Sequence, residues 1–181
     1  MLTDIDLDSI HYIAFNMREC DKEEIFNVLD YDCPYQFGWD AYTIFRNKGR
    51  ARIGWHRGKP AAVVGLVEER PTVWIISLFG TDDLKHVMFE IMRWGRHAIA
   101  ELATEFGGRR MQCDSRATHH ESHQFLRALG ARQEGEPMLN YGKDGGTYLR
   151  FVWVSGKDGW IRDRRYVGVA RRDIDEVAHA D

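Results

Sequence analysis

The sequence holds few cysteines and no apolar run long enough to cross a bilayer. Cys20, Cys33 and Cys113 show no metal-ligand spacing, so neither a disulfide framework nor a cysteine-based metal site is expected. No N-terminal signal pattern, internal repeat or low-complexity stretch is present. The net charge of -3 lacks the positive excess of nucleic-acid-binding proteins. These absences predict a cytoplasmic protein with no membrane span and no nucleic acid as its main partner.

The composition is that of a soluble globular domain. Apolar residues make up 44% and charged residues 29% of the 181-residue chain, which is long enough to bury a sizeable core. We expect one domain over residues 1–154 and a C-terminal tail over residues 155–181. The tail carries equal numbers of basic and acidic residues and the apolar anchors Trp160 and Tyr166. It either packs on its own domain or docks on another subunit.

Hydrophobic periodicity and turn residues predict the order of the elements. Residues 1–9 are expected to be loose. Asp21 is read as an N-cap, with Glu24 three residues later completing a capping box. The predicted elements are a strand at 11–17, helices at 21–30 and 34–48, strands at 52–56, 61–68 and 73–79, a long helix from about 82 to Gly107, a strand at 109–113, a helix at 120–129, and hairpin strands at 131–141 and 147–154.

Two runs predict a sheet that is covered on both faces. AAVVGLV (61–67) and VWIISLF (73–79) are apolar at consecutive positions, which is typical of central strands. The long helix carries apolar residues at spacings of three and four, with Gly95 expected to permit a close approach to the sheet. Because this helix lies between them, the strands at 73–79 and 109–113 are expected to be parallel.

This order, together with FLRALGARQEGE (125–136), resembles the GCN5-related N-acetyltransferase family over residues 10–154. The resemblance implies an α/β (α+β) fold with a mixed central sheet of about six or seven strands, about four flanking helices and a C-terminal extension. The segment RRMQCDSRATHHESHQFLRALGARQEGE is also similar to acetyltransferase-like proteins of short-tailed bacteriophages. That branch implies a role in virion assembly or as an internal virion component.

The family resemblance implies acetyl-CoA binding at the start of the long helix, through a loop with two glycines. If CoA binds here, the residues expected to contact it are Leu78, Phe79, Gly80, Thr81, Asp82, Asp83, Leu84 and Lys85. This loop has one glycine, and Asp82 and Asp83 place negative charge where a diphosphate would lie. Capping of the helix by Thr81 or Asp82, with the acidic pair complementing the helix dipole, explains these residues without a ligand.

A second departure from the family concerns proton donation. Many members carry a tyrosine four residues before the glycine that ends the second helix, and this chain has Leu126 there. A family asparagine is matched by His119. We therefore expect no catalytic residues, no cofactor and no metal. We expect a protein that acts through contacts with other proteins, in the host cytoplasm and the virion if it is phage-encoded. The alternative is an active acetyl-CoA-dependent N-acetyltransferase with a divergent loop.

Three further groups each have two readings. His119, His120 and His123 mark a solvated helix start or, through His119 and His123, a metal site. Glu68 and Glu69 are a solvated strand end or a general base that acts through water. Asp114, Ser115 and His119 hint at a hydrolytic triad, but no nucleophile elbow accompanies them. We favour the structural reading of each. Six tryptophans, with Trp39 and Trp160 outside the clear core strands, are compatible with a protein interface.

Overall fold

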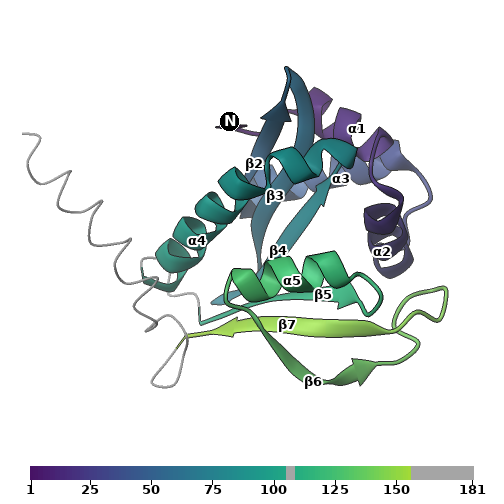
Figure 1. The fold of residues 1–181 in the computed structure, drawn as a ribbon, viewed down its shortest axis with the longest axis vertical. Coiled ribbons are helices and arrows are strands. Elements are labelled where there is room, and N and C mark those ends of the chain that lie inside the picture. Colours follow the sequence, from purple (N-terminus) through teal and green to yellow (C-terminus); the bar gives the residue numbers. More distant parts are fainter. Residues whose placement is uncertain (105–108, 156–181) are drawn as a thin grey trace, which may run out of the picture.

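The computed structural model describes residues 1–104 and 109–155, and within them seven strands form one mixed sheet (Figure 1). The strand order is β1-β2-β3-β4-β5-β7-β6. The strands are β1 (Leu2–Thr3), β2 (Gly49–His56), β3 (Lys59–Arg70), β4 (Val73–Gly80), β5 (Arg110–Arg116), β6 (Arg132–Met138) and β7 (Tyr148–Val154). The helices are α1 (Leu7–Phe15), α2 (Glu19–Leu29), α3 (Pro34–Lys48), the 3-10 helix η1 (Asp82–His86), α4 (Met88–Thr104) and α5 (His120–Ala128).

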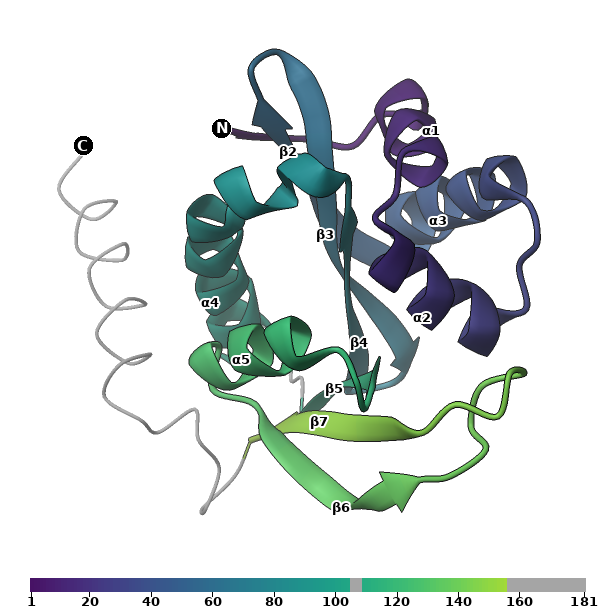
Figure 2. The ribbon, with the colours of Figure 1, turned by 45° about the vertical axis from the view of Figure 1, so that its right-hand side comes forward.

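The helices cover the sheet from both sides. Figure 2 shows α4 and α5 on one side of β3 and β4, and α1, α2 and α3 on the other. Neighbouring residues of β3 belong to opposite cores: Val64 packs with α4 and α5, whereas Val63 packs with α1 and α3. This alternation explains why the sequence of β3 is apolar at consecutive positions, as predicted. The mixed α+β fold is therefore confirmed.

The pairing between β4 and β5 sets the position of the candidate site. β2, β3 and β4 form an antiparallel meander, and β5, β7 and β6 form a second antiparallel unit. Among the described residues, the strands of the two units pair only where β4 runs parallel to β5, in three residue pairs from Val73↔Arg110 to Ile75↔Gln112. Beyond Ile75 the ladder between the two strands ends, so the carboxyl-terminal half of β4 offers an edge toward the second unit.

The predicted strand at 11–17 is wrong, because residues 11–15 belong to α1 and Asn16 is its C-cap. The carboxylate of Asp6 accepts a hydrogen bond from the amide of Ser9 at 2.8 Å and caps the helix. Ile10, Ile13 and Ala14 are buried at helical spacing. The first residues are not loose throughout either, since Leu2–Thr3 pairs with β2. The fold thus contains five α-helices among the described residues, rather than about four.

Two helix starts differ from prediction. α2 begins at Glu19 with Arg18 at its N-cap, and Asp21 and Glu24 form no capping box because their side chains bind distant parts of the chain. Before α4, Thr81 caps as expected: its Oγ1 accepts from the Asp83 amide at 3.2 Å. The capped element, however, is the 3-10 helix η1, and α4 itself begins at Met88.

The apolar face predicted for the long helix is confirmed. Ile91, Ala98, Ile99 and Leu102 are buried in the core that α4 shares with the sheet. Gly95 does not serve a close approach to the sheet, because a Cβ there would meet Leu129 near α5 at an ordinary 3.5 Å. The predicted end at Gly107 and the tail at 156–181 lie outside the described residues. No helix in the described part of the chain combines the length and apolar character of a bilayer span.

Candidate functional site

A cavity of about 430 Å³ lies where β4 and β5 part. Its walls come from both faces of the sheet, since α5 contributes Phe125 and Leu126 and α2 and α3 contribute Ile25 and Ala41. The cavity therefore passes through the sheet beside the edge of β4. We call it the β4/β5 cleft.

The β4/β5 cleft has one apolar and one polar wall. The apolar wall is formed mainly by α2, α3 and β3, with Ile25, Val28, Leu29, Ala41, Ile44 and Val67. The polar wall is formed by Glu69, Gln112, Asp114, Tyr141 and Arg150. The Arg150 guanidinium donates to both oxygens of Asp114 at 2.8 Å, and the Tyr141 hydroxyl donates to Asp114 at 2.7 Å. The hydrogen bonds to Asp114 raise the pKa of Arg150. Burial, followed by the bond to Asp114, raises the pKa of Tyr141.

Glu24 fastens α2 to the end of β5. Its Oε2 accepts hydrogen bonds from the Ser115 hydroxyl at 3.1 Å and the Arg116 amide at 3.0 Å, and it lies 2.8 Å from Nδ1 of His119. The hydrogen bond to Glu24 raises the pKa of His119, against the opposing effect of burial. The Tyr148 hydroxyl donates to the backbone carbonyl of Glu24 at 3.1 Å. α2 is thus held in place as a wall of the cleft.

The other anchor of α2 lies at the end of β4, in the predicted cofactor loop. The carboxylate of Asp21 accepts from the Gly80 amide at 3.0 Å, and Arg18 donates to Asp21 at 2.7 and 3.0 Å. The Arg18 amide donates to the Gly80 carbonyl at 2.9 Å. The Asp21 carboxylate therefore already accepts from a backbone N–H in the loop where the family resemblance places a diphosphate.

The predicted cofactor residues separate into two groups. Leu78 and Phe79 line the β4/β5 cleft. The other predicted residues, 80–85, are outside its lining: Thr81 and Leu84 are buried in packing, and Asp82 and Lys85 are exposed. The cleft thus meets the predicted segment only at its start.

Leu126 lines the cleft, as its family position implies, and cannot donate a proton. The hydroxyl and thiol groups in the lining belong to Tyr31, Ser77, Cys113, Ser115, Ser122 and Tyr141. Sequence reasoning missed Tyr141, Arg150 and Glu24 as cleft residues. Asp114 and Arg150 are cross-strand partners of β5 and β7, so a correct register would have brought this charge pair together.

The histidine cluster is not a solvated helix start. His123 is buried, and its Nε2 lies 3.0 Å from the Arg116 carbonyl. Burial lowers the pKa of His123. His119 binds Glu24 instead of lying in solvent, and its side chain is only 9% exposed. The solvated reading is correct for His120 alone, which is exposed.

The two glutamates at the end of β3 lie in different surroundings. Glu68 accepts from the Thr72 amide at 3.2 Å, so it closes the turn after β3. Glu69 faces the cleft and accepts from the Gln112 side chain at 3.4 Å. The triad of Asp114, Ser115 and His119 does not assemble, because Asp114 binds Arg150 while Ser115 and His119 both bind Glu24.

Two groups among the described residues place three metal-ligand atoms within 4.8 Å of one another. One consists of Cys20, Asp21 and His119, and the other of His56, Asp83 and His86. In the first group the Arg18 guanidinium already pairs with Asp21, which disfavours a cation. In the second group the rings of His56 and His86 are stacked at 12°, so their in-plane lone pairs do not converge on one point.

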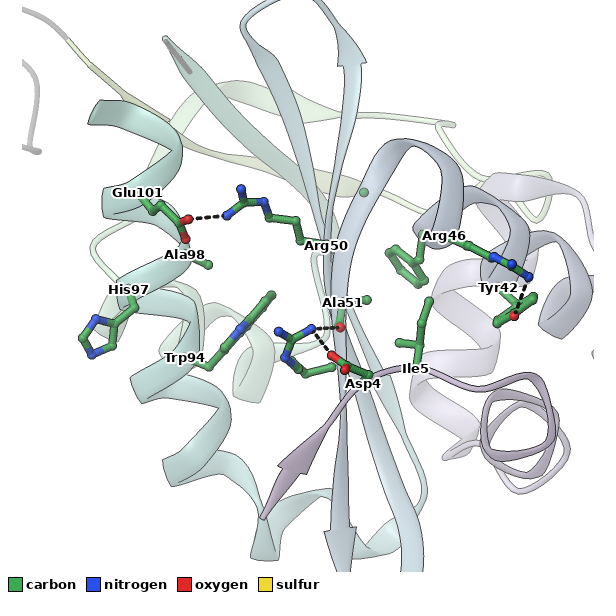
Figure 3. Close-up of a pocket in the computed structure, with 13 residues that line it drawn as sticks. Asp4, Ile5, Tyr42, Arg46, Arg50, Ala51, Trp94, His97, Ala98 and Glu101 are labelled. Carbon is green, nitrogen blue, oxygen red and sulfur yellow. Dashed lines mark hydrogen bonds and ion pairs between the residues drawn. The ribbon is translucent and has the colours of Figure 1, made fainter. Parts of the chain in front are cut away.

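A second hollow of about 590 Å³ lies at the edge of β2, away from the cleft (Figure 3). Two of its arginines form ion pairs, Arg50 with Glu101 at 2.7 Å and Arg52 with Asp4 at 2.8 Å, and Arg46 donates to the Tyr42 hydroxyl at 3.1 Å. Arg52 also donates to the Ala51 carbonyl at 3.0 Å, which protects part of the strand edge. These interactions within the protein explain the arginines without a ligand. The β4/β5 cleft is therefore the better candidate for a functional site.

No protein-family model and no curated protein sequence matches this chain. Solved structures do match in fold. The ribosomal L7/L12 alpha-N-protein acetyltransferase RimL in complex with coenzyme A gives a TM-score of 0.67 at 12% identity, covering 84% of this chain and 92% of that chain. Ribosomal-protein-alanine N-acetyltransferase from Brucella melitensis gives 0.60 at 13% identity, covering 86% and 99%. Spermidine N-acetyltransferase SpeG from Vibrio cholerae gives 0.61 at 11% identity, covering 91% and 99%. The chain has the fold of the GCN5-related N-acetyltransferases.

Proposed function

We propose that the protein binds a CoA thioester in the β4/β5 cleft and transfers its acyl group to an amine. The observation that carries this proposal is the cleft itself, which passes through the sheet beside the edge of β4 and contains a carboxylate, Glu69. A cavity whose lining comes from both faces of the sheet offers separate approaches for a thioester and an amine. A similarly folded acetyltransferase was solved with coenzyme A.

The thioester arm and the diphosphate of a CoA thioester fit this protein unequally. The apolar lining of the cleft, with Leu78 and Phe79 of β4, suits the narrow arm that carries the thioester. The diphosphate end meets Asp82, and the nearby Gly80 amide is already bound to Asp21. Tight binding of the diphosphate therefore requires donors other than the Gly80 amide.

The chemistry of the transfer assigns roles to the cleft residues. The CoA thioester supplies the acyl group, and the amine must lose a proton as the C–N bond forms and the C–S bond breaks. Glu69 is the candidate acceptor of that proton, because it lines the cleft and its carboxylate accepts a long hydrogen bond, from the Gln112 side chain at 3.4 Å. Tyr141 and Ser122 are the candidate donors to the departing thiolate in place of Leu126.

The test is calorimetric titration of the protein with acetyl-CoA and with CoA, followed by a thiol-release assay with a panel of primary amines. We expect a dissociation constant of about 100 μM or tighter, which corresponds to roughly 5.5 kcal/mol of binding free energy. Glu69→Gln should retain binding and lose most of the thiol release. Absence of binding at millimolar ligand would contradict the proposal.

A second candidate is a non-catalytic protein that acts through protein contacts, as the resemblance to phage virion proteins implies. The bond between Asp21 and the Gly80 amide favours it, because this bond removes a donor for a diphosphate. Exposed aromatic side chains on α1 and α3 also favour it: Phe15 is 61%, Tyr35 56% and Trp39 49% exposed. A protein that binds no CoA, and whose partner binding is lost in Trp39→Ser, would support this candidate over the first.

A further inference from the structure

The apolar wall of the β4/β5 cleft is larger than an acetyl group needs. Ile25 and Val28 of α2 face the cavity together with Ala41 of α3 and Val67 of β3. An acetyl group offers a single methyl carbon to such a wall. A cavity of about 430 Å³ with this lining leaves several aliphatic side chains without ligand atoms to contact.

The opposite wall is already satisfied within the protein. Asp114 accepts bonds from both Arg150 and Tyr141, and Gln112 donates to Glu69. A polar ligand would have to replace bonds that already exist, and such an exchange gains little free energy. The affinity available in the cleft therefore lies mainly on its apolar side.

The mouth of the cleft carries exposed apolar side chains from two helices. Leu29 at the end of α2 is 57% exposed, Ile44 of α3 is 45% exposed, and both line the cavity. The two positions come from different helices, and both line the cavity and are exposed. Covering these side chains with an apolar ligand would remove their surface from water.

We infer that the cleft takes an aliphatic group longer than acetyl, which lies along α2 and α3 and reaches the rim at Leu29 and Ile44. Two sources share this chemistry: the acyl chain of the CoA thioester, and the body of an aliphatic amine acceptor. The first source rests on the proposed function. The second needs only the cavity.

Two titration series distinguish the sources. In the first, the protein is titrated with free CoA and with acetyl-, butyryl-, hexanoyl- and octanoyl-CoA. In the second, it is titrated with linear alkylamines from butylamine to octylamine, in the absence of CoA. We expect affinity to rise about fourfold for each added methylene group in one of the two series.

Variants at the rim locate the bound chain. Leu29→Ser combined with Ile44→Ser should weaken binding of the longest ligand about tenfold more than it weakens binding of free CoA. Both side chains are largely solvent-exposed, so the double variant is expected to fold. Phe89→Ser is the matched control, because Phe89 is 77% exposed on α4 and does not line the cleft.

Each outcome decides between the claims. A length dependence in the thioester series assigns the aliphatic group to the donor, and one in the amine series assigns it to the acceptor. Affinities that do not change with chain length in either series would overturn the inference, even if CoA itself binds. If no CoA compound binds, and the affinity of the amines rises with chain length, the proposed function is overturned and the aliphatic site is supported.

Discussion

Glu24→Ala is the substitution that most sharply tests how α2 is held against the cleft. One carboxylate oxygen serves three groups from the end of β5 and the start of α5: Ser115, Arg116 and His119. The side chains of Glu24 and His119 are 17% and 9% exposed, so water replaces these bonds poorly. Hydrogen bonds to charged groups contribute about 1.5–3 kcal/mol each, with strong non-additivity. We therefore expect a loss of about 3 kcal/mol in the free energy of unfolding.

Urea denaturation measures this loss. With a slope of about 2–3 kcal/mol per molar urea, the midpoint should fall by about 1 M. Glu19→Ala is the control on the same helix, because Glu19 is 74% exposed and should change stability by less than about 0.5 kcal/mol. A Glu24→Ala variant as stable as this control would refute the reasoning that Glu24 fastens α2.

The pH dependence of stability provides a second readout. The bond to Glu24 raises the pKa of His119 above its ordinary value of 6.5, so the folded protein holds this proton more tightly than the unfolded chain. This stabilisation is complete below pH 6.5 and is lost as the pH rises through the raised pKa. Burial lowers the pKa of His123, so its contribution has the opposite sign and stability falls as the pH drops below 6.5. Glu24→Ala should remove the loss of stability at high pH, which His119 causes, and leave the loss at low pH, which His123 causes. Urea denaturation at a series of values from about pH 5 to about pH 9 measures both.

Three further stability predictions follow from packing, each measured by urea denaturation. Gly65→Ala should destabilise by about 1–3 kcal/mol, because its Cβ would lie 2.2 Å from the buried ring of Phe45; an unchanged midpoint would be incompatible with this contact. Gly95→Ala should stabilise by up to about 1 kcal/mol, because the methyl group has room and alanine favours the helix; a loss would show that the space is absent. Trp153→Phe should cost about 1–3 kcal/mol more than Trp74→Phe, because the Trp153 indole donates to a buried carbonyl at 3.0 Å, whereas that of Trp74 has no partner among the described residues; equal costs would contradict this difference.

Local signals in the sequence were sufficient to predict most of the helices and strands. Pro34 at the start and Gly49 after the end marked α3, and its predicted bounds are those observed. The apolar runs predicted β3 and β4, and the helix between β4 and β5 predicted their parallel pairing. α1 was missed because its short sequence also alternates in polarity, and the cap at Asp6 lay in a segment read as loose.

The candidate site was less predictable because its contacts span the chain. Glu24 was read as part of a local capping box, yet its partners lie 91 to 95 residues away. Asp21 meets Gly80 across 59 residues for the same reason. Such contacts depend on how the two halves of the sheet diverge, and no local pattern encodes that geometry. Of the predicted cofactor segment, only Leu78 and Phe79 line the β4/β5 cleft, where the strand itself forms the wall.

The most direct test of the account is a crystal structure of the protein grown with millimolar CoA or octanoyl-CoA. We expect electron density for the arm that carries the ligand's sulfur in the β4/β5 cleft, between the edge of β4 at Leu78 and the start of α5 at Ser122. An unoccupied cleft under these conditions, or CoA bound only elsewhere on the surface, would contradict the claim that this opening in the sheet is the binding site.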